Sequence, residues 1–197
     1  MEHFYRPELS HQFKRTGFVK LENVIPEANL EMLSHYYWFL MRNQRLNPFP
    51  TSLGKYSDLL SESFLLQYQK LFEKILGLQL YPNFSFMRLY YHKSKLDKHC
   101  DRKGCEFAVS ISIDYDADEI WPLFLKDSNG NQHSLSLDRG DMVLYKGCEL
   151  EHWRDVFPGK NSLQLFLFYV NANGAMKHHK FDKRKRLGDP MVPEETN

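Results

Sequence analysis

The spacing of hydrophobic residues changes partway along the chain, and the first part has the spacing of helices. Apolar residues recur every three or four positions, as in Leu30, Leu33 and Tyr37, and again over residues 58–78. This spacing places side chains on one face of a helix that packs against a core. We therefore expect residues 1–81 to be mostly helical.

From residue 82 the pattern changes to short apolar runs separated by turn residues, which is typical of strands. The predicted strands cover residues 84–92, 99–101, 107–115, 121–126, 133–137, 141–145, 149–156 and 162–171. A short strand is also expected over residues 17–21. Residues 43–57 contain two prolines and a glycine and are expected to form a loop.

Helices followed by many short strands predict an α+β fold. The strands would form a double-stranded β-helix, a jelly roll as in cupins, with the N-terminal helices packed on one sheet. A length of 197 residues fits a single domain. Within it, residues 1–81 would give mostly helical support, residues 82–171 the jelly-roll core, and residues 172–197 a basic tail that could be flexible.

The composition narrows the class of protein. Hydrophobic residues make up 42% and aromatic residues 15%, enough to bury a sizeable core. Lys and Arg (26) nearly balance Asp and Glu (25), which argues against binding to nucleic acid or a membrane surface. No apolar run approaches the roughly 18 residues that span a bilayer, and the N-terminus lacks the apolar core of a signal peptide.

The chain has three cysteines, Cys100, Cys105 and Cys148. They are odd in number and lack zinc-ligand spacing, so we interpret them as free thiols in a reducing compartment. The expected location is therefore the cytoplasm. Nothing in the sequence predicts the oligomeric state.

The candidate chemistry begins at His99-Cys100-Asp101. In a strand, residues two apart point to the same face, so the imidazole and the carboxylate would converge. A third ligand, His152, comes 51 residues after Asp101 and follows a turn-and-strand unit. Two histidines and one carboxylate form a facial triad that leaves coordination positions open on Fe(II). We predict that these three residues bind a metal and are catalytic.

Three blocks of this sequence resemble the prolyl-hydroxylase-like 2-oxoglutarate oxygenases, with the patterns Y-x-x-G-x-x-Y-x-x-H-x-D, G-D-x-L-x-F and H-x-x-x-P-V-x-x-G-x-K. Tyr90 falls at the first Tyr position, nine residues before His99. Residues 140–145 match the second block, and residues 152–159 match the third more loosely. The resemblance spans residues 82–171, although Lys93 replaces the Gly of the first block and Leu96 its second Tyr.

The resemblance implies an Fe(II)- and 2-oxoglutarate-dependent dioxygenase. Iron would be held by His99, Asp101 and His152, with 2-oxoglutarate chelating the iron and dioxygen taking the remaining position. Tyr90 would meet the 5-carboxylate of 2-oxoglutarate. The reaction would hydroxylate an unactivated C–H bond of an amino acid, a peptide or protein, or a small metabolite, because family resemblance does not fix the substrate.

The basic residue that anchors the 5-carboxylate is left open by the sequence. The family position falls on Ser162 or Asn161, depending on the alignment, and Lys160 comes one or two residues early. Arg154 lies two residues after His152, so within one strand it would share the inward face of that ligand. A guanidinium suits a carboxylate through paired hydrogen bonds.

Other polar residues could line the same pocket. Arg88 shares a strand face with Tyr90 and could contact either the co-substrate or an acidic group of the substrate. Ser110 and Ser112 alternate on one face of their strand. The main alternative function is a cupin-like metal-binding protein or pseudoenzyme without turnover. A metal-dependent isomerase or a cysteine-type dioxygenase is disfavoured, because those cupins use mostly histidine ligands.

Overall fold

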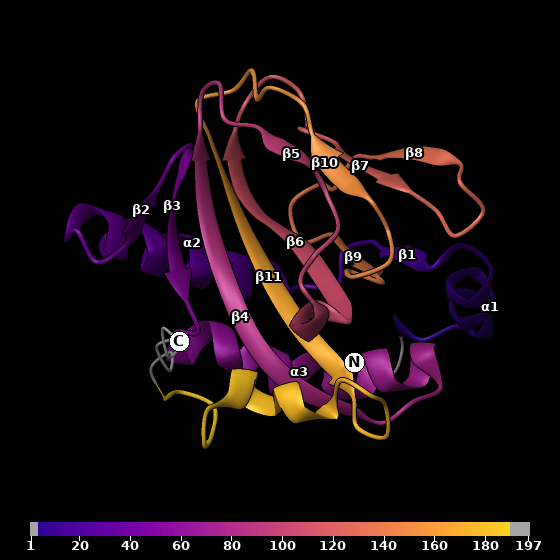
Figure 1. Ribbon diagram of the computed structural model, residues 1–197. Helices are drawn as coiled ribbons and strands as arrows, with labels where there is room; N and C mark the ends of the chain where they lie inside the picture. The colour runs from indigo at the N-terminus through magenta and orange to yellow at the C-terminus, as the bar shows by residue number, and fades with distance from the viewer. Residues whose placement is uncertain (1–3, 190–197) are drawn as a thin grey trace, which may run out of the picture.

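The computed structural model describes residues 4–189, whose strands form two antiparallel sheets (Figure 1). The large sheet has the order β1 (Phe18–Leu21), β9 (Met142–Tyr145), β6 (Phe107–Asp116), β11 (Asn161–Asn171), β4 (Leu80–Tyr91), β3 (Ser52–Tyr56) and β2 (Asn47–Phe49). The small sheet has the order β5 (Leu96–His99), β10 (His152–Arg154), β7 (Leu123–Lys126) and β8 (Gln132–Leu135). This is the predicted double-stranded β-helix.

Helices support one face of the large sheet. The helices are α1 (Pro7–Thr16), α2 (Glu27–Arg42) and α3 (Leu59–Leu76), with short 3₁₀ helices at Lys103–Cys105 and Lys177–Lys183. In Figure 1, α2 and α3 lie behind the long strands β4, β11 and β6, and the small sheet lies on the other side. Among the described residues, no helix combines the length and the hydrophobicity needed to cross a bilayer.

Strand alternation divides the large sheet between two hydrophobic clusters. On β11, Leu163, Leu165 and Leu167 pack with the helices, whereas Phe166 and Phe168 pack with residues of the small sheet. Because successive side chains of a strand point to opposite faces, one strand serves both clusters. The second cluster fills the space between the two sheets, where the candidate site lies.

Residues 43–57 differ from the sequence-based expectation of a loop. They contain the hairpin of β2 and β3, which extends the large sheet beyond β4. Its prolines are compatible with this position because β2 is an edge strand and needs no donor on its outer side. The hairpin brings Phe49 and Ser52 into contact with Arg88 of β4.

The C-terminal segment also differs from the expectation of a solvated basic tail, as far as the structure describes it. Arg184 is 4% exposed and pairs with Glu62 of α3 at 2.6 Å. Its guanidinium also donates to the backbone carbonyls of Asn83 and Asp189. The segment therefore packs beneath β4 and α3 (Figure 1). The part of the predicted tail over residues 190–197 lies outside the described residues.

Candidate metal centre

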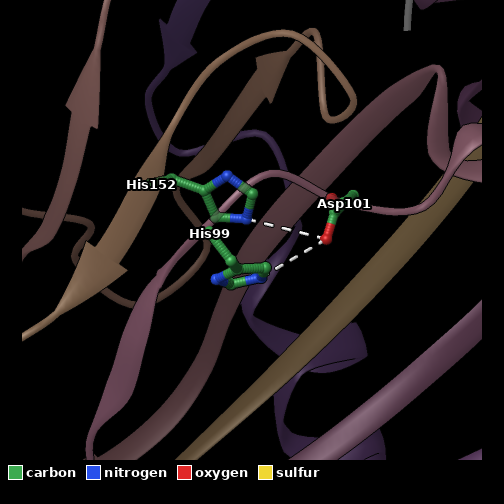
Figure 2. A group of neighbouring side chains, drawn as sticks. All are labelled: His99, Asp101 and His152. Carbon is green, nitrogen blue, oxygen red and sulfur yellow. Dashed lines mark ion pairs between the residues drawn. The ribbon is translucent and has the colours of Figure 1, made fainter.

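The three predicted ligands come together between the two sheets (Figure 2). His99 is the last residue of β5 and His152 the first residue of β10. These strands are antiparallel neighbours in which the two histidines are register partners, and their ring centroids are 4.3 Å apart. Asp101 follows two residues after His99, and its backbone N–H donates to the carbonyl of Gly147 at 2.9 Å.

The position of Asp101 corrects one element of the sequence analysis. The predicted strand over residues 99–101 ends at His99, so strand alternation does not aim the carboxylate. The loop that follows β5, held by the hydrogen bond to Gly147, brings Asp101 to the histidines instead. The convergence of the pair was predicted correctly, but for a different geometric reason.

The ligand atoms of the three side chains lie within 4.8 Å of one another. Oδ1 of Asp101 is 3.5 Å from Nε2 of His99 and 3.7 Å from Nε2 of His152, as the dashed lines of Figure 2 mark. Each histidine donates its Nδ1–H to a backbone carbonyl, that of Asp97 at 2.7 Å and that of Leu150 at 2.9 Å. Neutral rings held in this way present their Nε2 lone pairs to the centre, as metal coordination requires.

The second carboxylate oxygen of Asp101 indicates that the cluster fits a cation. Oδ2 is buried and has no hydrogen-bond partner among residues 4–189. A buried carboxylate oxygen without a donor is costly unless a cation or another ligand satisfies it. A divalent metal between the three side chains would bind Oδ1, which faces both histidines, and would balance the charge of this carboxylate. A facial set of two histidines and one carboxylate suits Fe(II) and leaves positions open for other ligands.

The two histidines have different pKa values. The contact with Asp101 is the largest cause that raises the pKa of His99 above its ordinary value. Burial lowers the pKa of His152. Protons therefore compete with a metal mainly at His99.

A cavity of about 120 Å³ opens beside the triad. Apart from the three ligands, its lining consists of Phe86, Arg88, Tyr90, Leu96, Leu123, Tyr145, Phe166 and Phe168. The lining is largely aromatic and aliphatic, so water would be scarce and charged contacts inside it would be strong.

Arg154 lies buried beside this centre, on the same face of β10 as His152. Its side chain donates to the backbone carbonyl of Trp121 and to Oε1 of Gln164, and its guanidinium carbon lies 4.9 Å from the centroid of the Trp121 ring. Burial lowers its pKa to about 10. No carboxylate lies within ion-pair distance of it among residues 4–189, so this buried charge has no counterion of its own.

A chain of hydrogen bonds connects Arg154 to β11. Gln164, its partner, donates from Nε2 to Oγ of Ser162 at 2.9 Å. Ser162 on β11 is one of the two residues at that position in the sequence, and it is the register partner of Tyr90. Arg154 on β10 is therefore linked through Gln164 to Ser162 on β11.

The structure does not bring Lys160 to the centre. Its side chain is 81% exposed and pairs with Asp116 at 3.2 Å, outside the cavity. The predicted serines Ser110 and Ser112 are buried on β6, where they are register partners of Phe166 and Gln164. They face the space between the sheets but do not line the cavity itself.

Two aromatic hydroxyls complete the surroundings of the triad. Tyr90 is fully buried, its hydroxyl accepts from Nη1 of Arg88 at 3.3 Å, and burial raises its pKa. Tyr145, which the sequence analysis did not single out, has its hydroxyl 3.5 Å from Nε2 of His152. Strand parity could have found it, because Tyr145 follows Val143 on the inward face of β9.

Comparisons with known proteins bear on the fold. No family model matches the chain, and no curated protein matches its sequence. Among solved structures it resembles a Pseudomonas putida prolyl-4-hydroxylase, with a TM-score of 0.69 and 16% identity over 83% of this chain and 97% of the other. The α-ketoglutarate-dependent carbocyclase SnoK from nogalamycin biosynthesis gives a TM-score of 0.75 and 13% identity over 98% and 95% of the two chains.

A third similar structure is HygX from Streptomyces hygroscopicus, solved with nickel and 2-oxoglutarate bound. It gives a TM-score of 0.68 and 13% identity over 86% of this chain and 88% of HygX. These identities are low, so the comparisons establish the fold. The double-stranded β-helix expected from the pattern of short strands is confirmed, and it is the fold of these 2-oxoglutarate oxygenases.

Proposed function

We propose that this chain is an Fe(II)- and 2-oxoglutarate-dependent oxygenase that hydroxylates an unactivated C–H bond of an amino acid, a peptide or a small metabolite. The observation that carries the proposal is the pairing of two features. Two histidines face Oδ1 of Asp101, and the other oxygen of this carboxylate has no donor among residues 4–189. Beside this triad, Arg154 provides a buried positive charge that has no counterion within the described part of the chain.

In this proposal His99, Asp101 and His152 would hold the iron, and the bound iron would supply dioxygen activation coupled to decarboxylation of 2-oxoglutarate. Arg154 would bind the 5-carboxylate of the co-substrate, and Tyr90 would donate its hydroxyl proton to the same group. Phe166 and Phe168 would keep water from the reacting atoms.

The structures of HygX with nickel and 2-oxoglutarate support this assignment, because a metal and a dicarboxylate occupy a protein of the same fold. The similar structures also include a carbocyclase and an epimerase, so hydroxylation is the part of the proposal that depends on this chain's own chemistry. The competing function is a metal-binding protein without turnover. Arg154 favours the oxygenase, because a pseudoenzyme has no need for a buried unpaired guanidinium.

The test is succinate formation by the full chain with Fe(II), 2-oxoglutarate, ascorbate and dioxygen, against a panel of amino acids, peptides and small metabolites. We expect slow succinate release without substrate and faster release with the correct one, together with a product heavier by one oxygen atom. Iron should support this activity and zinc should not. Activity restored by zinc alone, with iron inert, would contradict the proposal.

A further inference from the structure

A second guanidinium, that of Arg88 on β4, lies at the rim of the same cavity. It is half-buried, whereas Arg154 is 2% exposed. Arg88 is the only Lys or Arg among the described residues that line the cavity. Its charge is close enough to His99 to oppose protonation of that ring.

Arg88 is held in place by neutral groups. Nε donates to Oγ of Ser52 at 3.1 Å, and Nη1 donates to the hydroxyl of Tyr90 at 3.3 Å. The guanidinium carbon lies 5.4 Å from the ring centroid of Phe49 and 5.9 Å from that of Phe86. Contacts with aromatic faces fix the plane of the guanidinium without neutralising its charge.

One edge of this guanidinium is free. Among residues 4–189, no group accepts a hydrogen bond from Nη2 of Arg88, and no carboxylate lies within ion-pair distance. A pre-oriented guanidinium with free donors suits a carboxylate, which it can bind through two parallel hydrogen bonds. The guanidinium of Arg88 can therefore bind an anion, which no group among residues 4–189 supplies.

The charge balance of the proposed site points to the primary substrate as the source of that anion. A divalent metal and Arg154 would together balance Asp101 and the two carboxylates of 2-oxoglutarate. The positive charge of Arg88 then remains without a counterion in the described part of the chain. A single guanidinium matches a single carboxylate better than a phosphate dianion, which usually has several donors and cations around it.

The position of Arg88 also favours the substrate over the co-substrate. Its partners Phe49 and Ser52 belong to the β2–β3 hairpin and also line a groove of about 400 Å³. Arg88 thus contacts residues of this groove and itself lines the cavity beside the triad. Arg154, in contrast, lies deeper, with 2% of its surface exposed.

We propose that Arg88 binds a carboxylate of the primary substrate, so that the substrate is a small carboxylic acid or carries an acidic side chain. This inference rests on the proposed oxygenase function. Phe49 and Phe86 would flank the bound carboxylate, and the rest of the molecule would extend along the groove beside the hairpin.

The experiment measures binding rather than turnover. The full chain is loaded with Mn(II) and 2-oxoglutarate without oxygen, and titrated calorimetrically with a panel of small carboxylic acids and the primary amide of each acid. We expect the acids that bind to exceed their amides by about 30-fold in affinity, as for loss of a partly buried charged hydrogen-bond pair. Absence of any acid-over-amide preference overturns the proposal.

Variants then identify the residue responsible. Arg88→Met should remove the acid-over-amide preference, and Arg88→Lys should restore part of it, because the charge returns without the paired donors. Lys93→Met, which removes an exposed lysine of the same groove, is the matched control and should leave the preference unchanged. Loss of the preference in Lys93→Met but not in Arg88→Met would reject Arg88 as the anion site.

The affinity for 2-oxoglutarate is measured in the same samples and separates the two proposals. It should change less than about threefold in Arg88→Met. If it falls as steeply as in Arg154→Met, Arg88 belongs to the co-substrate and the substrate inference fails. If the wild-type chain binds no 2-oxoglutarate but still prefers acids through Arg88, the oxygenase proposal fails and the anion site stands.

Discussion

His99 and His152 are register partners on the antiparallel strands β5 and β10, and their ring centroids lie 4.3 Å apart. Side chains of directly opposed residues are the closest neighbours that a sheet offers. The sheet therefore supplies two of the three metal ligands, and only Asp101 depends on a loop. A site built mainly on paired strands is held more rigidly than one built on loops.

Removing any ligand should abolish metal binding. We expect His99→Ala, Asp101→Ala and His152→Ala each to weaken Mn(II) binding by more than about 100-fold, since loss of a group outside the ligands already costs about 10–100-fold. Calorimetric titration gives the affinity, and circular dichroism checks the fold. His133→Ala, which removes a histidine of β8 paired with Asp127, is the control. An Ala variant of the triad with wild-type affinity would refute the triad.

Metal affinity should fall as the pH is lowered through the pKa of His99. The contact with Asp101 raises that pKa above its ordinary 6.5, and a protonated imidazole cannot coordinate a metal. Burial lowers the pKa of His152, so this ring gains its proton at a lower pH than His99. The stability of the metal-free fold should change with pH in the opposite direction. The raised pKa of His99 stabilises the fold at low pH, and this stabilisation is lost as the pH rises through that pKa. Mn(II) titrations and urea unfolding between about pH 6 and pH 8 would measure both; an Mn(II) affinity independent of pH would contradict the prediction.

Arg154 should matter for 2-oxoglutarate and Lys160 should not. Loss of one partner of a buried charged pair costs about 2–5 kcal/mol, which corresponds to about 30-fold or more in affinity. Arg154→Met keeps much of the side-chain volume and should show this loss. Lys160→Met removes a charge that is 81% exposed and should change the affinity less than about twofold. The dissociation constant for 2-oxoglutarate, measured on each Mn(II)-loaded variant, tests this prediction. A larger loss of affinity in Lys160→Met than in Arg154→Met would identify Lys160 as the residue that binds the 5-carboxylate.

Gly147 should tolerate no side chain. A Cβ there would lie 2.7 Å from Oδ2 of Asp101 and also press on the carbonyl oxygen of Cys105. Gly147→Ala should therefore displace the carboxylate and lower metal affinity by about tenfold or more. The control is Gly130→Ala, where positive φ adds strain of about 1 kcal/mol but nothing lies within 4 Å. If both variants lose stability and metal affinity alike, the effect of Gly147→Ala is not specific to Asp101.

The C-terminal segment should contribute strongly to stability through Arg184. Arg184→Met breaks the buried pair with Glu62 and should lower the free energy of unfolding by about 3–5 kcal/mol, because the charge of Glu62 stays buried. Arg186→Met is the matched control, since Arg186 is 81% exposed in its pair with Asp189 and should cost less than about 1 kcal/mol. Urea unfolding of the two variants measures the difference. Equal costs would mean that the segment is not part of the cooperative fold.

The sequence determined the features that follow from local periodicity. Period-two alternation and turn residues predicted the strands of the jelly roll. The same alternation predicted that Arg154 shares the inward face of His152, because both lie in one short strand. The fold class was confirmed. The metal assignment remains a prediction, although its three residues do converge.

Only the tertiary structure decided which distant residues meet. It turned residues 47–56 into a hairpin at the edge of the large sheet, buried Arg184 against α3, and pointed Lys160 into solvent after the turn at Pro158. Within residues 4–189 it also left Arg154 without a carboxylate partner. Local backbone geometry sets the face of each side chain, but pairing between strands far apart in sequence sets its neighbours, and no short pattern encodes that pairing.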